Sequence, residues 1–441
     1  MNDSPIAVQR FSDSVIWQQQ REYFHKAGSR AWEDTVIPSY ITSNAWIARA
    51  YAQVVLGYLR DALSQQSGLV HIIDVGAGSG QFAFHFLKQL QQFYADSVIN
   101  GKISYRYVVT DFTPSNIDFC SQHPAMQDFI DRGLLDFALL DVTRDEPIKL
   151  LKSGESLQPG KVPGPVVLIA NYLFDSIPQD LFCLQNGQLQ ACLPKVSAAD
   201  MSEVDGQVEY DYRPIALDYY SEPHFNALLK YYANLKDLGT THIPFPVAGL
   251  RFLDRIKAMA DKGLLLLTAD KGFSQKRQLR GREAPRFAKH GADCFSLSVN
   301  YHLIDRFIKN HGGYSWLPNW QHRSLCVAGF LLNMSSAIET NQACESMFGY
   351  FGPDDFFTLK RNLERNFSTM TLREIFAYIR FSAYDSTAFQ RGCRAIKEYS
   401  LELKPNDIGE IKALAEKVRA NHYDLGHFDL DAEVKSLLKN T

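Results

Sequence analysis

The chain has 441 residues, of which 46% are hydrophobic and 22% are charged, and its formal net charge at pH 7 is −3. This composition is typical of a globular protein, and the small net charge excludes a global electrostatic attraction to nucleic acid or to membrane surfaces. The length predicts two domains, or one large domain with an appendage. No apolar run approaches the roughly 18 residues of a membrane span, so we expect no membrane insertion.

The cysteine and histidine patterns bear on compartment and metal binding. Seven cysteines are scattered along the chain without a Cys-x-x-Cys pair, which indicates a reducing compartment rather than a disulfide framework or a zinc site. The N-terminus has no signal-peptide core, so we expect a cytoplasmic protein. The twelve histidines show no metal-ligand spacing, and the nearest pair, His422 and His427, is expected at a surface corner. No metal is therefore expected.

The segment before residue 66 predicts helices. Residues 14–25 could form one helix, and after Pro38 the apolar residues of a second helix recur on one face. These residues are Trp46, Ile47, Ala50, Val54 and Leu59. We expect residues 1–65 to form a helical segment that packs on the core.

The stretch from His71 to Leu90 has three parts, which are an apolar run, a glycine-rich turn and a segment with helical periodicity. Its turn contains Asp74, Gly76, Gly78 and Gly80 at alternate positions. Strand, turn and helix together are typical of a nucleotide-type site, because glycines let the backbone approach a ligand and a helix start presents unpaired N–H groups. A plain structural turn is one alternative. A dinucleotide site is another, although its usual spacing is Gly-x-Gly-x-x-Gly.

Two further strands are expected to end in acids. Residues 103–111 predict a strand that ends at Asp111, where doubly wound nucleotide folds bind the ribose hydroxyls. Residues 134–142 predict a strand that ends at Asp141, where such folds hold the adenine amino group. A capping role for Asp111 and a solvated loop position for Asp141 are the alternatives.

The fourth strand begins at Val166 and ends at Asn171, at the edge of the sheet where ligands bind in parallel α/β folds. Asn186-Gly187, between alternating apolar residues, then predicts a β-hairpin. Residues 195–245 break the alternation of strands and helices and are rich in tyrosine and acids. We expect them to form an insertion that covers the edge of the sheet as a lid.

The α/β pattern returns with a helix at 247–260 and a strand at 263–270, which a basic loop follows. A solvated surface is the plain interpretation of that loop, and docking of an acidic protein or of nucleic acid is the alternative. Without interleaved aromatic residues, nucleic acid is the less favoured partner. Residues 294–299 and 324–332 predict two more strands, with a helix at 303–310 between them.

From residue 336 the pattern changes to successive amphipathic helices separated by Ser, Pro, Asn and Gly. We expect residues 336–441 to form an α-helical domain that packs on the core or binds a partner. The corner at 421–428 resembles that of a tetratricopeptide repeat, although no clean 34-residue period is present.

Several stretches, in the same order, resemble the MidA-like class I methyltransferases, relatives of the mitochondrial complex I assembly methyltransferase, which use S-adenosylmethionine (SAM). They are SYITS near residue 40, DVGAGSG at 74, TDFTPSNIDFCSQHP at 110, NYLFDSIP at 171, TADKGF at 268 and GADCFSLSVNYHLIDRFIKNHGG at 291. The likeness spans roughly residues 35–332 and does not include the C-terminal helices.

The resemblance implies a Rossmann-like α/β fold of the class I methyltransferases, with a mostly parallel, doubly wound sheet in residues 66–335, a lid inserted at about 195–245 and a C-terminal helical appendage. It implies SAM as the cofactor and a protein arginine as the acceptor, and hence a protein substrate or partner. The implied cofactor-binding residues are Asp74, Gly76, Ala77, Gly78, Gly80, Asp111, Phe112, Asp141 and Asn171. The implied catalytic residues, near the transferred methyl group, are Asp175, Asn171 and Tyr172.

The chain departs from the family where glutamates are usual, because Tyr172 and Ala45 occupy those positions. Methylation of a guanidinium needs carboxylates, since the pKa of arginine lies above about 12. Either Asp175 and Asp270 do this work, or the acceptor is not arginine, or catalysis has been lost. A catalytically impaired SAM-binding assembly factor and a small-molecule methyltransferase are therefore the alternatives to a protein methyltransferase. A nucleic-acid acceptor is not expected, because no Asn/Asp-Pro-Pro-Tyr/Phe run follows the fourth strand.

Overall fold

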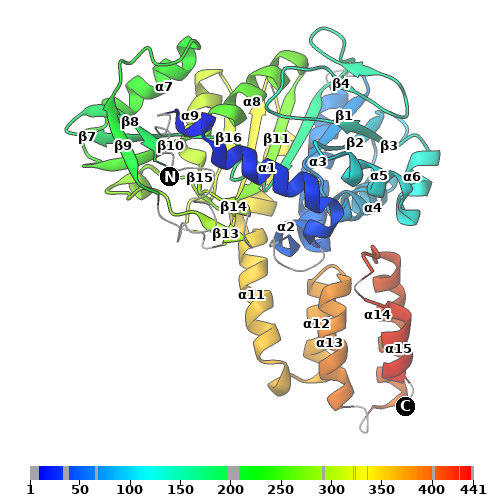
Figure 1. Ribbon diagram of the computed structural model, residues 1–441. Coiled ribbons are helices and arrows are strands. Elements are labelled where there is room, and N and C mark those ends of the chain that lie inside the picture. Colours follow the sequence, from blue (N-terminus) through cyan, green and yellow to red (C-terminus); the bar gives the residue numbers. More distant parts are fainter. Residues whose placement is uncertain are drawn as a thin grey trace.

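The computed structural model of the chain describes residues 9–32, 39–64, 68–195, 208–290, 294–320, 322, 324–334, 336–399, 403–426 and 428–438. In this part of the chain a central sheet carries helices on both faces, and a group of helices projects from it (Figure 1). Among these residues, no helix is both long and apolar enough to cross a membrane.

The central sheet has seven strands in the order β16-β17-β11-β6-β1-β2-β3. Their bounds are β1 Val70–Val75, β2 Tyr105–Asp111, β3 Leu135–Leu139, β6 Val166–Asn171, β11 Leu264–Asp270, β16 Tyr314–Trp316 and β17 Cys326–Leu332. The five strands from β11 to β3 pair in parallel, and β17 runs antiparallel to both of its neighbours. Strands β2 and β3 lie on one side of β1, and the later strands β6, β11, β17 and β16 lie on its other side. This topology confirms the doubly wound sheet, with the reversal of strand order between β1 and β6.

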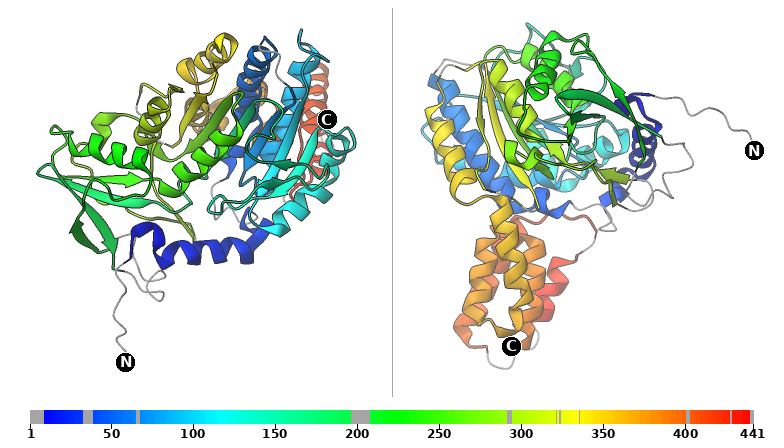
Figure 2. Two further views of the ribbon diagram at one scale, coloured as in Figure 1. Left: turned by 90° about the horizontal axis from the view of Figure 1, so that it is seen from above. Right: turned by 90° about the vertical axis from the view of Figure 1, so that its left-hand side faces the viewer.

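Helices cover both faces of the sheet (Figure 2). Side chains along β6 alternate between two hydrophobic cores, one on each face. Val166 and Leu168 belong to the first core, whereas Val167 and Ile169 belong to the second. Burial on both faces explains why β6 and β11 are unbroken apolar runs in the sequence. The helices that contribute to the first core include α7 (Pro223–Ala233), α8 (Val247–Met259) and α9 (Tyr301–Asn310). Those that contribute to the second include α3 (Ala45–Ser64), α4 (Gln81–Ala95) and α5 (Pro114–Gln122).

A second, antiparallel sheet has the order β10-β7-β8-β9. Its strands are β7 Asp180–Gln185, β8 Gln188–Pro194, β9 Tyr210–Pro214 and β10 Thr241–Phe245, and α7 (Pro223–Ala233) lies between β9 and β10 in sequence. The hairpin predicted at Asn186-Gly187 is confirmed, with φ of 52° and 78° at these two residues. The described part of 195–245 thus completes a sheet that already begins at residue 180.

The remaining α-helices and strands before residue 336 are mostly short. They are α1 Val15–Ala27, α2 Tyr40–Ser43, α6 Gln127–Asp131, β4 Ile148–Lys149, β5 Ser156–Leu157, β12 Gly272–Phe273, β13 Ala288–His290, β14 Cys294–Ser296 and β15 Val299–Asn300. The single strand expected at 294–299 is wrong, because β14 pairs with β13 whereas β15 pairs with β12. In the basic loop Arg277, Arg280, Arg286 and Lys289 are exposed, as expected for a solvated surface. Arg282 differs, because its guanidinium lies 4.0 Å from the ring centre of Phe273.

The C-terminal region is helical, as expected. Its elements are α10 Ile338–Cys344, a π-helix at Glu345–Tyr350, α11 Pro353–Arg365, α12 Leu372–Phe381, α13 Ser386–Glu398, α14 Pro405–Ala420 and α15 Leu430–Leu438. Helices α12 to α15 enclose a hydrophobic core of their own, which includes Ile375, Phe389, Ile396 and Val418. The sequence pattern did not indicate α10, which packs on α3. A relation to tetratricopeptide repeats stays a prediction.

The contacts that join the C-terminal helices to the N-terminal part of the fold include those of Asp385 and those of Tyr423. The Asp385 carboxylate accepts hydrogen bonds from the Tyr40 hydroxyl at 3.0 Å and from the Ala45 N–H at 3.4 Å. The Tyr423 hydroxyl donates to the carbonyl of Ser79 at 2.9 Å, and its ring stacks on His123 at 3.9 Å. The second contact places a C-terminal residue directly against the glycine turn.

Candidate functional site

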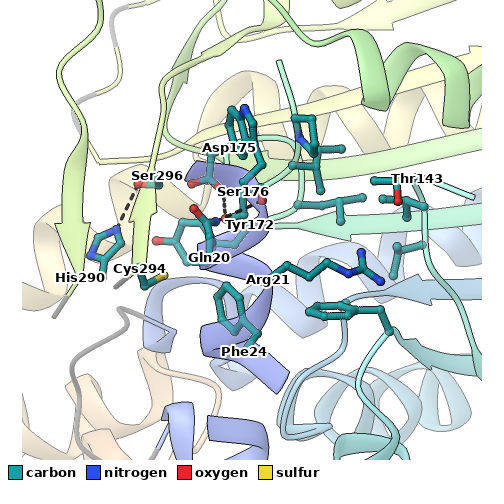
Figure 3. Close-up of a pocket in the computed structure, with 18 of the residues that line it drawn as sticks. Gln20, Arg21, Phe24, Thr143, Tyr172, Asp175, Ser176, His290, Cys294 and Ser296 are labelled. Atoms are coloured by element: carbon teal, nitrogen blue, oxygen red, sulfur yellow. Dashed lines mark hydrogen bonds between the residues drawn. The ribbon is translucent and has the colours of Figure 1, made fainter. Parts of the chain in front are cut away.

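A cavity of about 660 Å³ lies at the carboxyl ends of β1, β2, β3 and β6 (Figure 3). The ends of these strands contribute Gly76, Asp111, Phe112, Asp141, Tyr172 and Asp175 to its wall. Helix α1 contributes Trp17, Gln20, Arg21 and Phe24, and the β13–β14 hairpin contributes His290, Cys294 and Ser296. The cavity therefore occupies the switch point where doubly wound sheets bind their ligands.

The glycine turn between β1 and α4 needs glycine for two different reasons. Gly76, Gly78 and Gly80 have φ of 69°, 57° and 76°, in the left-handed region that disfavours side chains. A Cβ at Gly76 would meet only the Leu173 side chain, at 3.9 Å, so this glycine leaves the backbone open to the cavity. A Cβ at Gly80 would lie 2.7 Å from Cys120 Sγ, so the third glycine is required by packing within the protein.

Asp111, at the end of β2, binds the glycine turn and also lines the cavity. One carboxylate oxygen accepts from the Gly78 N–H at 3.1 Å, and the other accepts from the Thr113 N–H at 2.8 Å. Burial raises the pKa of Asp111, while these hydrogen bonds act in the opposite direction. A carboxylate has about four acceptor positions. The two N–H groups take one on each oxygen, and the side chains of Thr113 and Asn116 also lie within reach of the carboxylate, so a ribose hydroxyl would compete with these side chains for the remaining positions.

Asp74 does not line the cavity. Its carboxyl group is buried in the sheet and accepts a hydrogen bond from the Tyr107 hydroxyl at 2.8 Å. Burial raises the pKa of Asp74 to about 7. Ala77, Gly78 and Gly80 are also absent from the wall of the cavity as the described residues define it. In this structure Gly76 is the part of the turn that borders the cavity.

Asp141 lines the cavity, but its carboxylate is already engaged. Thr143 donates to one oxygen from its N–H and its hydroxyl, at 3.0 and 2.7 Å. The Arg21 guanidinium donates to the other oxygen at 2.5 Å, and Arg144 Nε lies 3.2 Å from it. The guanidinium carbon of Arg21 also lies 4.8 Å from the ring centre of Phe112. The adenine contact predicted for Asp141 therefore requires Arg21 to move aside.

Asn171, at the end of β6, provides a test of whether the site fits SAM. Its side-chain oxygen accepts from the Tyr51 hydroxyl at 3.0 Å, whereas its Nδ2 is buried and has no hydrogen-bond partner among the described residues. A buried donor without a partner is costly unless a ligand satisfies it. The carboxylate at the methionine end of SAM is such an acceptor. Asn171 itself is not among the described residues that line the cavity, whereas Tyr172, the next residue, lines it with φ of 51°. Together with the acceptor capacity of Asp111, this donor fits the cofactor.

Asp175 and Asp270 form a buried pair of carboxyl groups. The Ser176 hydroxyl donates to Asp175 at 2.7 Å, and the Tyr301 hydroxyl donates to Asp270 at 2.7 Å. Burial and the neighbouring Asp270 raise the pKa of Asp175 well above its usual range. Burial raises the pKa of Asp270 to about 6, against the hydrogen bonds that it accepts. At neutral pH the pair therefore retains a proton on Asp175, which is the member that lines the cavity.

Helix α1 covers the cavity, a role that the sequence did not indicate. Arg21 connects it to Asp141 beyond β3, and Gln20 Nε2 donates to the carbonyl of Ser176 beyond β6 at 3.1 Å. The lid expected at 195–245 is wrong for the described residues 208–245, none of which lines this cavity. The sequence feature that could have indicated this role of α1 is the polar pair Gln20 and Arg21, which lies beside the apolar stripe of the predicted helix.

The β13–β14 hairpin lies on the side of the cavity opposite Thr143 (Figure 3). His290 Nε2 and Ser296 Oγ are hydrogen-bonded at 3.1 Å, and Cys294 lies beside them. Burial, and to a smaller extent Asp175, raises the pKa of Cys294 to about 12. The thiol is therefore protonated at neutral pH, which argues against a nucleophilic role. The sequence assigned no function to these residues.

Comparisons with known proteins identify the family of the chain. A family model described as "Putative S-adenosyl-L-methionine-dependent methyltransferase" matches residues 52–290, which is more than half of the chain. Among solved structures, a Burkholderia thailandensis protein bound to S-adenosyl-homocysteine is 14% identical, with 77% of this chain and 97% of that chain covered and a TM-score of 0.42. An uncharacterised protein from the same organism is 13% identical, with coverages of 77% and 97% and a TM-score of 0.42. Human N-acetylserotonin methyltransferase in complex with SAM is 11% identical, with coverages of 72% and 66% and a TM-score of 0.26.

No curated protein matches the chain. Solved structures this distant are similar in fold alone, so the assignment depends on the family model and its extent. Because that model spans more than half of the sequence, the chain belongs to this family of S-adenosyl-L-methionine-dependent methyltransferases.

Proposed function

We propose that the enzyme transfers the methyl group of SAM to a nitrogen of a protein side chain, of the arginine type, and that Asp175 holds this nitrogen. The observation that carries the proposal is the buried Asp175–Asp270 pair, of which only Asp175 lines the cavity. Two carboxyl groups that share a proton form a site which a cation can occupy in its place. A guanidinium is the side chain that presents both a cation and hydrogen-bond donors to such a pair.

The residues of the site have distinct roles in this proposal. Asp111 accepts from the ribose hydroxyls, and Asn171 Nδ2 donates to the amino-acid end of the cofactor. SAM, when bound, supplies an activated methyl group. Much of the rate then comes from holding donor and acceptor in line.

Asp175 supplies the base. Entry of the guanidinium displaces the shared proton and leaves Asp175 ionised. The N–C bond forms as the S–C bond breaks, and the proton of the nitrogen passes to the Asp175 carboxylate, because arginine with a pKa above about 12 retains it until then. Asp270 stays behind the wall of the cavity, where hydrogen bonds from Tyr301 and Thr268 stabilise its charge.

A second feature supports a protein as the substrate. A groove of about 760 Å³ lies where the C-terminal helices meet α3 and α4. Its described wall contains five basic residues and no acid, and the basic residues are Arg49, Lys88, Arg132, Arg380 and Lys417. Trp46, Phe381 and Tyr384 lie among them. Charge complementarity favours an acidic polypeptide segment as the occupant, which would let the helical region recruit the substrate.

Labelling with methyl-labelled SAM in a cell lysate tests the acceptor. We expect label in a protein band and N-methylarginine after hydrolysis of that band. Asp175→Asn should abolish labelling while S-adenosylhomocysteine still binds by calorimetry, and Gly78→Arg should abolish binding itself. Asp145→Asn is the matched control, because this acid is exposed and does not line the cavity. Labelling that survives in Asp175→Asn would refute the role of Asp175.

The groove is tested separately with a fluorescein-labelled polyglutamate peptide. We expect the double variant Lys88→Glu, Lys417→Glu to lose binding, and Lys102→Glu, an exposed lysine outside the groove, to retain it. Tighter binding of a single-stranded oligonucleotide than of the peptide would contradict an acidic protein partner.

One observation favours a second candidate, a small acidic molecule as the acceptor. Lys271 also lines the cavity, and α1 covers it, so the space resembles a closed small-molecule pocket. Label in small-molecule extracts but not in protein would support this candidate. Cofactor binding without any labelled product would instead support an assembly factor that has lost catalysis.

A MidA-like enzyme of a reducing, cytoplasmic compartment is part of the proposal. The order of the motifs supports the subfamily, and the seven cysteines, all free and buried, support the compartment.

A further inference from the structure

Three potential metal ligands meet outside the cavity, on three helices that Figure 1 shows in the same part of the molecule. His224 lies in α7, Asp254 lies in α8, and His311 follows the last residue of α9. His224 Nε2 lies 2.6 Å from Asp254 Oδ2, and His311 Nε2 lies 3.9 Å from Asp254 Oδ1. One donor atom from each residue lies within 4.8 Å of the other two.

The ring of His311 is held in a way that suits metal binding, whereas His224 Nε2 is hydrogen-bonded to Asp254 Oδ2, so an ion would replace the proton of that bond. His311 Nδ1 donates to the carbonyl of Phe307 at 2.8 Å, so its Nε2 carries the lone pair that faces the cluster. A backbone carbonyl on the second ring nitrogen is a frequent partner of metal-ligating histidines, because it sets the tautomer and the ring orientation. Phe307 also packs on both histidine rings, with ring centres 4.5 Å from His311 and 6.0 Å from His224.

The spacing is close to that of a zinc site. Ligands at about 2.0–2.1 Å from a tetrahedral ion lie roughly 3.4 Å from one another. The two observed distances from Asp254, 2.6 and 3.9 Å, lie on either side of this value, so an ion needs shifts of less than about 1 Å. Two imidazoles and a carboxylate are donors that zinc accepts, and a water molecule would complete four-coordination.

We propose that His224, Asp254 and His311 form a binding site for a divalent transition-metal ion of the zinc class. None of the three lines the cavity, so the ion would act by holding elements together rather than in methyl transfer. It would add a link between α7 and the helices α8 and α9, which already share one hydrophobic core with it. The metal would thereby reinforce the attachment of the segment 208–245 to the central sheet.

Lys257 provides a test in which the expected change in metal affinity is opposite to that of the histidine variants. Its Nζ lies 3.6 Å from Asp254 Oδ1, so it competes with a bound cation for the same carboxylate. The lysine stem is flexible and about a quarter exposed, and it can turn toward solvent when the ion binds. Removal of this charge should tighten metal binding, although it removes an ion pair from the metal-free protein.

The experiment uses the full chain, stripped of metal and dialysed against zinc chloride. Inductively coupled plasma mass spectrometry should find one zinc ion per chain, and zinc but not magnesium should raise the unfolding temperature. His224→Gln and His311→Gln should weaken zinc binding at least 100-fold, Lys257→Gln should tighten it at least threefold, and His242→Gln, on the second sheet, should leave it unchanged.

Two outcomes would overturn the proposal. Zinc that binds the His224→Gln and wild-type chains equally would place the ion elsewhere. A wild-type chain whose unfolding temperature does not respond to zinc, while Lys257→Gln only destabilises it, would show that the cluster is a hydrogen-bonded contact between helices and binds no metal. Because Lys257→Gln and the wild-type titration do not depend on the histidine variants, a folding defect in those variants leaves the test intact.

Discussion

Gly80, the third glycine of the turn, packs against other parts of the protein and does not line the cavity. A substitution at this position therefore tests packing separately from cofactor binding. With φ of 76°, it lies in the left-handed region, and a Cβ there would approach Cys120 Sγ to 2.7 Å, the Tyr423 hydroxyl to 3.2 Å and Met126 Cε to 3.3 Å. We predict that Gly80→Ala destabilises the fold more than the backbone conformation alone requires.

The expected magnitude has two parts. An alanine in the left-handed region costs about 1–2 kcal/mol relative to glycine. Insertion of a methyl group into a packed core adds about 1–3 kcal/mol. Gly133 has φ of 69° and no atom within 4 Å of its would-be Cβ, so Gly133→Ala carries the first part without the second. The difference between the two variants should therefore be about 1–3 kcal/mol.

Urea denaturation of both variants measures this difference. Cys120→Ala removes the atom with the closest approach, so the double variant Gly80→Ala, Cys120→Ala should regain about 1 kcal/mol relative to the sum of the single changes. Equal losses in Gly80→Ala and Gly133→Ala would refute the packing argument, and so would strictly additive effects in the double variant.

Three further predictions concern the surroundings of the cavity. Arg21→Met should tighten S-adenosylhomocysteine binding about three- to tenfold in calorimetry, because the cofactor no longer displaces a guanidinium from Asp141, and weaker binding would show that Arg21 contacts the cofactor. The folded-state pKa of Asp74, about 7, lies above its unfolded value, so the folded chain binds the extra proton and its ionised carboxylate destabilises the fold as the pH rises through this range. Asp74→Asn should therefore raise the unfolding free energy at pH 8, by up to about 4 kcal/mol, and leave it nearly unchanged at pH 4, which urea denaturation at the two pH values checks. Tyr423→Phe removes only the hydrogen bond to Ser79, so it should cost about 1 kcal/mol of stability and weaken cofactor binding. Tyr399→Phe removes a similar bond within the C-terminal helices and should leave cofactor affinity unchanged.

Much of the core could be predicted because its signals are local. Unbroken apolar runs such as residues 166–170 arise where a strand is buried on both faces, and the glycine turn combines three left-handed positions in five residues. The strand ends at Asp111 and Asn171 follow from the same periodicity. A parallel sheet brings the carboxyl ends of its strands to one edge, so these predictions were sufficient to locate the cavity.

The details of the site depend on contacts between residues far apart in the chain. Arg21 reaches Asp141 across 120 positions, and no periodicity in either segment indicates this pairing. Asp175 and Asp270 share a proton only because β6 and β11 are neighbours in the sheet. Asp74, beside the glycines in the sequence, points into the core because side chains alternate along a strand, and Tyr107 of the next strand meets it there. The sequence by itself therefore determined the sheet, the glycine turn and the edge that binds the ligand. The tertiary structure decided which side chains face the cavity, which carboxyl group retains a proton and which helix covers the site. The reason is that burial and the proximity of charges exist only once distant segments have packed together.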